Sequence, residues 1–389
     1  MPTIDFSNTQ IAFEYKTNKE LQQAYKLFKL LSYPALVNAG AVLSPLLVNC
    51  GGKFLIKKTL YKQFVGGETR EECLSILNTL AKYNIGSILD YSVEGEQNEE
   101  SFEQCKNEII DNILFSKDKS YIPFCVFKPT GMIRFSILEK VSANASLSIN
   151  EKNEWERGKK RVFEVCQKAY EHHQPIFIDA EESWIQKAID DIADECMQTF
   201  NQKECIVLNT YQLYRTDRLE FLSQSIEKAR KNKYLLGAKL VRGAYMEKER
   251  DRAQKMNYPS PIHPDKISTD RAYNNALKLC IENIDILTTC AGTHNEESSQ
   301  YLVNLMEQYQ IEKSDKRVYF SQLLGMSDHI SFNLAKAGYN VVKYVPYGPV
   351  KSVLPYLIRR AQENTSVKGQ TGRELSLITK ELKRRRLGE

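Results

Sequence analysis

The residues best suited to chemistry lie near the C-terminus, in the run 344–364. Tyr356, Arg359, Arg360 and Glu363 recur at i, i+3, i+4 and i+7, so they form one stripe on a predicted helix. Two adjacent guanidinium groups repel each other, and their planar forks suit a carboxylate or a phosphate. The stripe therefore predicts an anion site. The alternative is a solvated helix face that carries an Arg360–Glu363 ion pair.

The residues around this stripe predict how the helix is held. A short apolar run, Val341 to Val345, leads into a Pro/Gly turn. Pro349 is expected in the first helical turn, where a missing N–H costs nothing. Leu354, Leu357 and Ile358 lie on another side of the predicted helix and form its packing face.

The composition is that of an ordinary globular protein. The chain has 389 residues, of which 42% are hydrophobic and 26% are charged. The formal net charge of +5 is too small to indicate nucleic acid as a partner. Nine scattered cysteines without a CxxC pair favour reduced thiols inside a cell. No apolar run approaches the ~18–20 residues of a membrane span, and the N-terminus shows no signal or transit pattern.

From about Gly86 the chain alternates between short apolar runs and amphipathic stretches. Continuous apolar runs are typical of buried parallel strands, and eight βα units favour a (β/α)8 TIM-type barrel of the α/β class. A doubly wound open sheet is the alternative, but the GxGxxG expected of a dinucleotide fold is absent. The predicted strands are 87–91, 122–127, 175–178, 205–208, 238–241, 286–290, 318–320 and 341–345. The predicted helices between them are about 101–116, 151–171, 182–199, 217–231, 268–283, 296–309 and 328–337.

Two further regions flank this pattern. Residues 1–85 are expected to form an N-terminal helical arm, with a capping box at Thr69 and Glu72, and 86–365 form the barrel with its arginine helix. Residues 366–389 form a basic C-terminal tail with a weak apolar stripe. Such a tail suits an anionic membrane surface, and the alternative is a solvated helix end whose cations complement the helix dipole.

A barrel places its chemistry at the C-terminal ends of its strands, and polar residues follow nearly every predicted strand. Lys128 is expected to join the two arginines around one anion, with Glu94 and Asp179 orienting them. A structural ion-pair cluster is the alternative. A second group offers donors for phosphate or for the heteroatoms of a flat ring: Gln212, Lys239, Arg242, Thr293, His294 and Asn295. A third group is an apolar wall, or simple barrel packing: Ala244, Tyr245, Leu323 and Tyr344.

Other classes of function stay open on these residues alone. The five histidines form no recognisable ligand set, so no metal site is predicted. Lys128 or Lys239 could form a Schiff base, which would make the barrel a lyase. A non-catalytic protein that binds RNA or membrane through its tail is a third interpretation.

Four segments in consistent order between about Phe64 and Val367 resemble the proline dehydrogenase family. They are 177–182 (Phe-Ile-Asp-Ala-Glu-Glu), 237–249, 293–295 (Thr-His-Asn) and 356–364. The resemblance implies a distorted (β/α)8 barrel that holds FAD, and the monofunctional type of enzyme. It further implies oxidation of L-proline to Δ1-pyrroline-5-carboxylate, the first step of proline catabolism, with electrons passed to a membrane quinone. We expect a bacterial cytoplasmic protein, peripheral on the inner membrane through its basic tail, and no nucleic acid partner.

The resemblance also suggests roles for individual residues. Lys128, Arg359 and Arg360 resemble the groups that bind the substrate carboxylate, Glu94 resembles the acid that pairs with the arginines, and Asp179 resembles a supporting acid. Residues that resemble the walls around the proline ring are Tyr344, Tyr356, Tyr245, Ala244 and Leu323. Residues that resemble FAD contacts are Gln212, Lys239, Arg242, Gly243, Thr293, His294, Asn295 and Glu363. Tyr344, in place of a small residue, favours proline over hydroxyproline.

Overall fold

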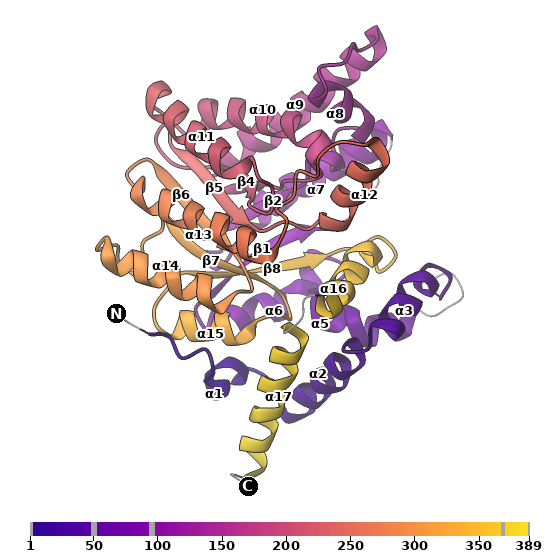
Figure 1. The fold of residues 1–389 in the computed structure, drawn as a ribbon, viewed down its shortest axis with the longest axis vertical. Coiled ribbons are helices and arrows are strands. Elements are labelled where there is room, and N and C mark those ends of the chain that lie inside the picture. Colours follow the sequence, from indigo (N-terminus) through magenta and orange to yellow (C-terminus); the bar gives the residue numbers. More distant parts are fainter. Residues whose placement is uncertain (1–2, 48–52, 93–97, 367–369, 388–389) are drawn as a thin grey trace. The chain divides into compact units, whose positions relative to one another are not determined.

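A computed structural model describes residues 3–47, 53–92, 98–366 and 370–387. Its eight strands follow one another in chain order around a closed barrel, as the eight predicted βα units require. Figure 1 labels the helices and strands along the chain. The predicted (β/α)8 class is confirmed. The chain divides into two compact units, one formed by Gly95–Ser321 and the other by Thr3–Glu94 with Gln322–Glu389.

All eight predicted strands are present. They are β1 (Ile85–Tyr91), β2 (Phe124–Phe127), β3 (Ile176–Ile178), β4 (Val207–Gln212), β5 (Leu236–Val241), β6 (Leu287–Gly292), β7 (Val318–Leu323) and β8 (Val341–Tyr347). The largest shift is in β4, which was predicted over 205–208 but continues through Asn209, Thr210 and Gln212. These polar side chains are buried, and each makes a hydrogen bond inside the protein: Asn209 to Asp190, Thr210 to the Ile178 carbonyl and Gln212 to the Glu181 carbonyl.

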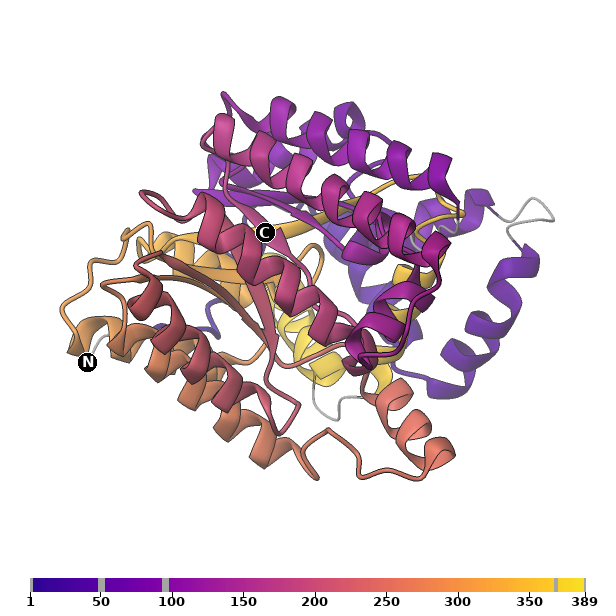
Figure 2. The same cartoon turned by 90° about the horizontal axis from the view of Figure 1, so that it is seen from above.

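The first unit contains the parallel pairs from β2 to β7 and the helices that cover them (Figure 2). Its helices are α7 (Glu99–Ser116), α8 (Phe135–Ser142), α9 (Ile149–Glu171), α10 (Ser183–Phe200), α11 (Arg218–Asn232), α12 (Met246–Met256), α13 (Lys266–Glu282) and α14 (Glu296–Gln308). A short 3-10 turn, η3 (Pro129–Gly131), follows β2. In the register, Thr210 of β4 lies opposite Lys239 of β5, which in turn lies opposite Cys290 of β6. Lys239 is therefore carried by a strand with neighbours on both sides.

Helices α8 and α12 were not predicted. Helix α12 has no continuous apolar stripe, because its sequence is Met-Glu-Lys-Glu-Arg-Asp-Arg-Ala-Gln-Lys-Met. Polar contacts hold it instead. The fully buried Glu249 accepts hydrogen bonds from the backbone N–H and the hydroxyl of Ser183, each at 2.6 Å. Glu249 thus caps the N-terminus of α10, whose own N-cap residue, Glu182, makes no side-chain cap.

The second unit combines the arm, two strands and three later helices. Its arm contains α1 (Thr9–Phe13), α2 (Asn18–Leu31), α3 (Pro34–Leu47), α4 (Lys53–Ile56), the π-helical turn η2 (Lys57–Tyr61), α5 (Lys62–Phe64) and α6 (Arg70–Lys82). The later helices are α15 (Asp328–Lys336), α16 (Leu354–Ser366) and α17 (Gln370–Leu387). Strands β1 and β8 pair in parallel, with Ile88 opposite Tyr344. One hydrophobic cluster joins α2, α3, α16 and α17, and it includes Phe28, Val37, Leu357 and Leu377.

Two predicted helix starts differ in detail. Helix α16 begins at Leu354, not at Pro349, because Pro349 opens a preceding turn in which its carbonyl accepts from the N–H groups of Ser352 and Val353. Pro355 is the proline in the first helical turn, where no N–H is needed. At α6, Thr69 caps the Glu72 N–H as predicted. The Glu72 carboxylate, however, accepts from the N–H of Glu68, so the reciprocal half of the capping box is shifted by one residue.

The C-terminal tail forms α17 and packs on α2. Ile378 of its predicted apolar stripe is buried in the cluster, and Leu375 and Leu382 of the stripe pack against it. Leu377, which was not part of the predicted stripe, is also buried there. Arg385 donates to the backbone carbonyls of Phe13 and Lys16, which satisfies oxygen atoms at and just beyond the C-terminus of α1. Within the described residues, no helix has the length and apolar character needed to cross a bilayer.

A buried charge cluster joins the two ends of this unit. The Lys343 side chain on β8 is fully buried, and its Nζ donates to Asp328 Oδ1 at 2.7 Å and to the Met326 carbonyl at 2.6 Å. Tyr15 donates its hydroxyl hydrogen to Asp328 Oδ2 at 2.7 Å. Burial raises the pKa of Asp328, but Lys343 and Lys16 outweigh burial and hold the pKa below its usual value. The Asp328 carboxylate is therefore charged, and it depends on its cationic partners.

This dependence predicts a large stability loss for Lys343→Met. Removing one member of a buried ion pair leaves the other charge without compensation, so we expect the free energy of unfolding to fall by about 3–5 kcal/mol in urea titrations. Lys336→Met, at an exposed position of α15, is the matched control and should change it by less than about 0.5 kcal/mol. Equal, small effects for the two variants would show that the cluster does not hold the unit together.

Candidate functional site

The first part of the site lies at the ends of β3 and β5. Lys239 is 4% exposed, and its ammonium group forms an ion pair with the carboxylate of Asp179, the residue directly after β3. The same ammonium lies 5.3 Å from the centre of the Phe177 ring, which adds a cation–π contact. Asp179, predicted for the anion site, and Lys239, predicted for the second group of donors, are thus in direct contact. The pair presents a fixed positive and a fixed negative group at the end of the barrel where chemistry is expected.

Glu181, two residues beyond Asp179, is a buried acid that sequence reasoning did not include in the site. Its carboxylate accepts from the backbone N–H of Thr130 at 3.0 Å and from the Thr130 hydroxyl at 2.5 Å. Burial raises the pKa of Glu181 to about 7, against the hydrogen bonds from Thr130 and the positive charge of Lys128. These bonds fix the turn η3, which begins directly after Lys128. Glu181 therefore holds the backbone that presents the predicted substrate-binding lysine.

The backbone of Glu181 is held from both sides. The Gln212 amide on β4 donates to the Glu181 carbonyl at 2.6 Å, and the Glu181 N–H donates to the Gln186 side-chain oxygen at 2.8 Å. This contact orients the amide of Gln212, a predicted FAD contact. It also leaves Glu181 little freedom to move relative to β4 and α10.

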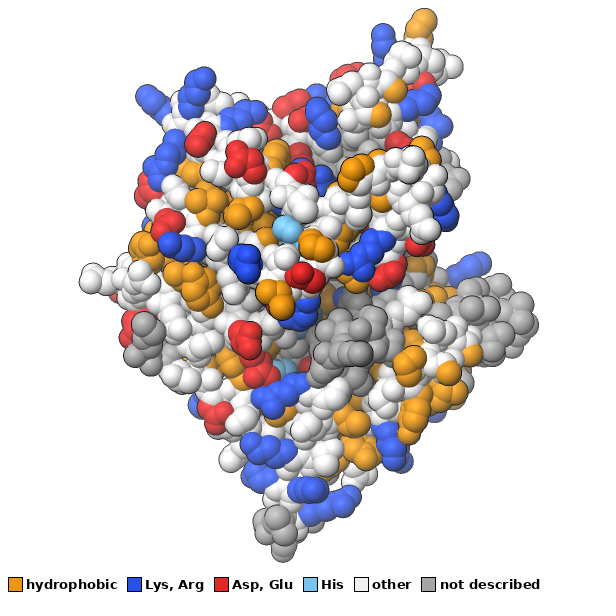
Figure 3. Space-filling model, viewed as in Figure 1, with side chains coloured by type: hydrophobic (Ala, Val, Ile, Leu, Met, Phe, Trp, Pro, Cys, Tyr) orange, Lys and Arg blue, Asp and Glu red, His pale blue; other side chains and the backbone are white. Residues whose placement is uncertain are grey.

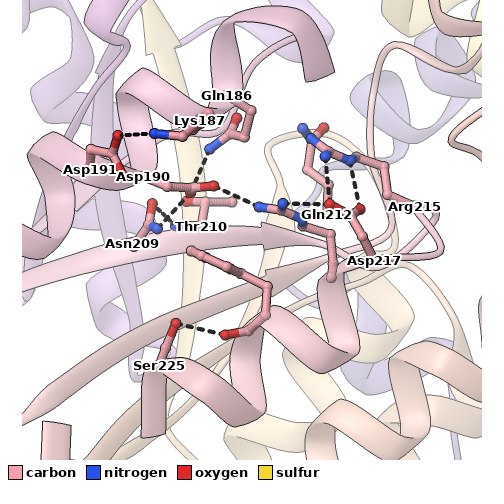
Figure 4. A network of polar contacts seen from close by, with 12 residues as sticks. Gln186, Lys187, Asp190, Asp191, Asn209, Thr210, Gln212, Arg215, Asp217 and Ser225 are labelled. Atoms are coloured by element: carbon pink, nitrogen blue, oxygen red, sulfur yellow. Dashed lines mark hydrogen bonds and ion pairs between the residues drawn. The ribbon is translucent and has the colours of Figure 1, made fainter. Parts of the chain in front are cut away.

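A polar network behind these contacts fixes Gln186 in turn (Figure 4). Asp190 accepts from the Gln186 amide at 2.9 Å, from the Asn209 amide at 2.9 Å and from Arg218 at 2.6 Å. Asp190, Asn209 and Arg218 come from α10, β4 and α11, and all three side chains are buried. A buried network of this kind is stabilising only when its members are satisfied, and it then holds its elements in one arrangement.

The second part of the site surrounds Arg242, directly after β5. Its guanidinium donates to Asp270 at 2.8 Å, to the Thr293 hydroxyl at 2.7 Å and to the Ser298 hydroxyl at 3.0 Å. It also lies 4.4 Å from the centre of the Tyr273 ring. Burial raises the pKa of Asp270, but hydrogen bonds from Lys266 and Arg242 outweigh burial and keep this acid ionised. Arg242 and Thr293, both predicted site residues, are thus brought together.

The remaining predicted residues of this unit line the two loops that follow β5 and β6. His294 is half-buried beside Thr293, and Asn295 caps α14 by accepting from the Ser298 N–H at 2.7 Å. Gly243 has φ of 144°, and a Cβ there would meet the Tyr214 ring at 2.4 Å, so only glycine fits. Ala244 is exposed and Tyr245 is half-buried at the start of α12.

The second unit carries the arginine helix. Arg360 is 6% exposed, and its guanidinium lies 5.0 Å from the centre of the Tyr356 ring, as their i and i+4 positions predicted. Arg359 is half-buried, and Leu357 lies in the hydrophobic cluster on the predicted packing face. Tyr344 on β8 is buried, and Leu323 at the end of β7 is half-buried. Glu94 and the side chain of Glu363 lie outside the described residues, so their predicted roles stay predictions.

Sequence reasoning missed the residues that support the predicted ones. Asp270 and Ser298 lie inside helices α13 and α14, where polar residues normally face solvent. Glu181 carried a usable signal, because it lies in the same Asp-Ala-Glu-Glu run as Asp179. Among the residues that the structure describes, no group of three or more His, Cys, Asp or Glu side chains is arranged to hold a metal ion.

The raised pKa of Glu181 predicts a pH-dependent stability. Between its unfolded value of about 4.3 and its folded value of about 7, the folded protein binds a proton that the unfolded chain has lost. Stability from this group therefore falls as pH rises through that window. Glu181→Gln removes the effect. In urea unfolding, the free energy of unfolding of the variant minus that of the parent protein should therefore be about 2–3 kcal/mol higher at about pH 8 than at about pH 5.

The control for this experiment is Glu204→Gln, at an exposed carboxylate of the same unit. The free energy of unfolding of this control, relative to that of the parent protein, should change by less than about 0.5 kcal/mol over the same pH interval. A Glu181→Gln difference that is constant with pH would contradict the buried, protonated carboxyl.

Comparisons with known proteins agree with this geometry. The family model described as "Proline dehydrogenase" matches residues 73–373. The carbapenem antibiotics biosynthesis protein CarD of Pectobacterium carotovorum subsp. carotovorum is 34% identical, over 84% of each chain. A hydroxyproline dehydrogenase of Xenopus laevis is 32% identical, over 96% of this chain and 88% of the relative.

Longer relatives are matched over part of their length. Proline dehydrogenase 1, mitochondrial, of Dictyostelium discoideum is 33% identical, over 85% of this chain and 66% of that protein. Proline utilization A (PutA) from Bdellovibrio bacteriovorus has the same fold, with a TM-score of 0.76 and 18% identity. That match covers 97% of this chain and 44% of the PutA chain. The family model spans most of this chain and both groups of site residues, and the chain therefore belongs to the proline dehydrogenase family.

Proposed function

We propose that this chain oxidises L-proline to Δ1-pyrroline-5-carboxylate by hydride transfer to FAD and passes the electrons to a quinone, as the first step of proline catabolism. The observation that carries the proposal is the family match over residues 73–373, which includes the strand-end cations of the first unit and the arginine helix of the second. Family membership supports oxidation of proline in general. The cofactor, the acceptor and the individual roles below are proposed.

The residues at the ends of β4, β5 and β6 fit FAD. Lys239, Arg242 and Thr293 offer cationic and hydroxyl donors, and the amide of Gln212 is held in a fixed orientation. Such donors suit phosphate oxygens and the heteroatoms of a flat ring. Bound FAD supplies the two-electron acceptor that no amino-acid side chain provides. Asp179 and Asp270 fix the two cations, so they hold the donors in place before the cofactor binds.

We propose that Arg359 and Arg360 bind the substrate carboxylate. Lys128 is the third cation of this site, and its role rests on the sequence resemblance. The ring of Tyr356 packs beside Arg360 and limits the space in which its guanidinium can move. Tyr344 and Leu323 supply apolar surface for the proline ring. A relative in Xenopus is named a hydroxyproline dehydrogenase. We propose that proline is preferred here, because the Tyr344 phenol fills space that a ring hydroxyl would need.

We place the reaction in the bacterial cytoplasm, with the protein peripheral on the inner membrane, because a quinone acceptor is dissolved in the bilayer. The basic tail is the membrane contact predicted from the sequence, and this assignment remains a prediction. Three of its cations already have partners in the second unit: Lys380 donates to the Ser7 carbonyl, Arg384 pairs with Glu381, and Arg385 caps α1.

Absorbance spectroscopy tests the cofactor and the reaction together. The purified protein should show flavin bands near ~450 nm, and anaerobic L-proline should bleach them, because the two electrons move to the flavin. trans-4-Hydroxy-L-proline, added at the same concentration, should bleach them more slowly. A colourless protein that FAD does not reconstitute would contradict the proposal. Borohydride trapping of a lysine adduct with substrate would then favour the lyase interpretation.

Arg359→Met and Arg360→Met test the carboxylate assignment. Each variant removes charge-assisted hydrogen bonds worth about 1.5–3 kcal/mol, so KM for proline should rise by about tenfold or more. The flavin spectrum should persist, because the proposed FAD donors lie in the other unit. Lys351→Met, at an exposed cation in the turn before α16, is the matched control and should leave KM unchanged. An unchanged KM in both arginine variants would remove these residues from substrate binding.

A further inference from the structure

The arm contains a long stretch without acidic residues. From Leu21 to Gly67 the sequence has no aspartate or glutamate and no arginine, and its charged residues are six lysines. They are Lys26, Lys29, Lys53, Lys57, Lys58 and Lys62. The stretch covers most of α2 and all of α3, α4, η2 and α5, so its charge is of one sign over several adjoining helices.

The same stretch exposes large apolar side chains. Leu30 is 52% exposed, Tyr33 52%, Leu36 54% and Phe54 66%. A surface helix normally turns a polar face to solvent. Helix α3, by contrast, has no charged residue in Pro34–Leu47. Its Val37 points into the hydrophobic cluster, so the exposed apolar groups lie outside the core that already holds the helix.

The lysines lie beside these apolar groups. Lys26, Lys29 and Lys58 are exposed, and the Lys58 ammonium lies 4.0 Å from the centre of the Phe54 ring. Lys53 and Lys57 share one carboxylate, that of Glu68, just beyond the stretch. Figure 3 shows hydrophobic side chains gathered over α2 and α3, with lysines next to them. We call this region the arm surface: Leu30, Tyr33, Leu36 and Phe54 with Lys26, Lys29 and Lys58.

We propose that the arm surface binds an anionic phospholipid bilayer. The apolar side chains would enter the boundary between headgroups and acyl chains, and the lysines would contact the lipid phosphates. The biological purpose of this contact rests on the proposed function, because it brings the protein to the bilayer that dissolves the quinone. The binding itself does not depend on turnover and is tested separately.

The charge of the arm surface favours a bilayer over a second copy of the chain as its partner. In a symmetric dimer the same patch supplies both sides of the contact, so the lysines of both copies would be gathered in one interface. The stretch offers no acid to compensate them, and juxtaposed like charges are costly in an interface. An anionic bilayer supplies the missing negative charge and accepts the apolar groups at the same time.

The arm surface is also connected to the arginine helix. Helix α3 packs against α16, and Val37 lies in one cluster with Tyr356, Leu357 and Ala361. The helix that touches lipid would therefore be the direct packing partner of the helix that carries Arg359 and Arg360.

Vesicle flotation tests the proposal with the full chain. The protein should float with vesicles of phosphatidylethanolamine and phosphatidylglycerol, float less with phosphatidylcholine alone, and be released by high salt. Tyr33→Glu/Leu36→Glu should lower the bound fraction at least about tenfold, because it removes two apolar anchors and adds negative charge. The matched control Lys383→Glu/Arg386→Glu changes two exposed cations of α17 and should float like the parent.

Proline-dependent reduction of a soluble dye separates this inference from the proposed function. The arm variant should retain the parent rate with dye, which also shows that it is folded, and lose reduction of a bilayer-dissolved quinone. A parent protein that oxidises proline but does not float overturns the inference alone. Loss of flotation only in the tail variant would also overturn it. So would a parent dimer that the arm variant converts to a monomer, with no vesicle binding by either.

Discussion

The structure depends on one constraint, which is that a charge taken out of water at the end of a parallel strand needs a partner. Lys239 on β5 and Lys343 on β8 are both buried. Lys239 is paired with Asp179, which follows β3, and Lys343 is paired with Asp328 at the start of α15. The desolvation cost of such a charge is several kcal/mol, and it is offset only by close, well-oriented partners. Asp179 and Asp328 therefore contribute fixed positions to the fold as well as charge. Each unit contains one of these pairs, so each can hold its own strand ends in register.

The same constraint explains why residues outside the predicted site hold its charged side chains in place. Arg242 carries a full charge next to buried surface, and Asp270, Thr293 and Ser298 together satisfy its guanidinium. Glu181 is a different case, because burial outweighs the hydrogen bonds from Thr130 and the positive charge of Lys128, and raises the pKa of its carboxyl to about 7. A carboxyl with a pKa of about 7 is largely neutral below that pH, where it can hold the turn without adding a competing negative charge beside Lys128. The acid that orients the turn is thus separate from the acid that pairs with Lys239.

Elements with a repeating sequence pattern could be predicted. Elements whose polar side chains find hydrogen-bond partners far away in the sequence could not. Eight apolar runs were enough to find eight strands, and helical spacing placed Tyr356 beside Arg360. The polar half of β4 was not recognised as strand, because Asn209 and Gln212 are buried only through Asp190 and Glu181, whose positions no local pattern reveals. Helix α12 was missed for the same reason, since Glu249 and Ser183 are 66 residues apart. The start of α16 was displaced because two prolines, at 349 and 355, both fit a first helical turn, and only the turn hydrogen bonds decide between them.

The two basic regions show why composition alone does not identify an interaction surface. The tail contains consecutive arginines at 384–386, yet Arg384 is neutralised by the buried carboxylate of Glu381 and Arg385 is used to cap α1. Such cations stabilise the fold, and a ligand that competed for them would have to replace those bonds. The stretch Leu21–Gly67 of the arm has no run of consecutive arginines, but it contains no acid and exposes leucine, tyrosine and phenylalanine beside its lysines. A surface that combines charge of one sign with exposed apolar area gains on both counts from an anionic bilayer. The stronger candidate for lipid contact is therefore the arm surface, although the tail has the more conspicuous run of arginines.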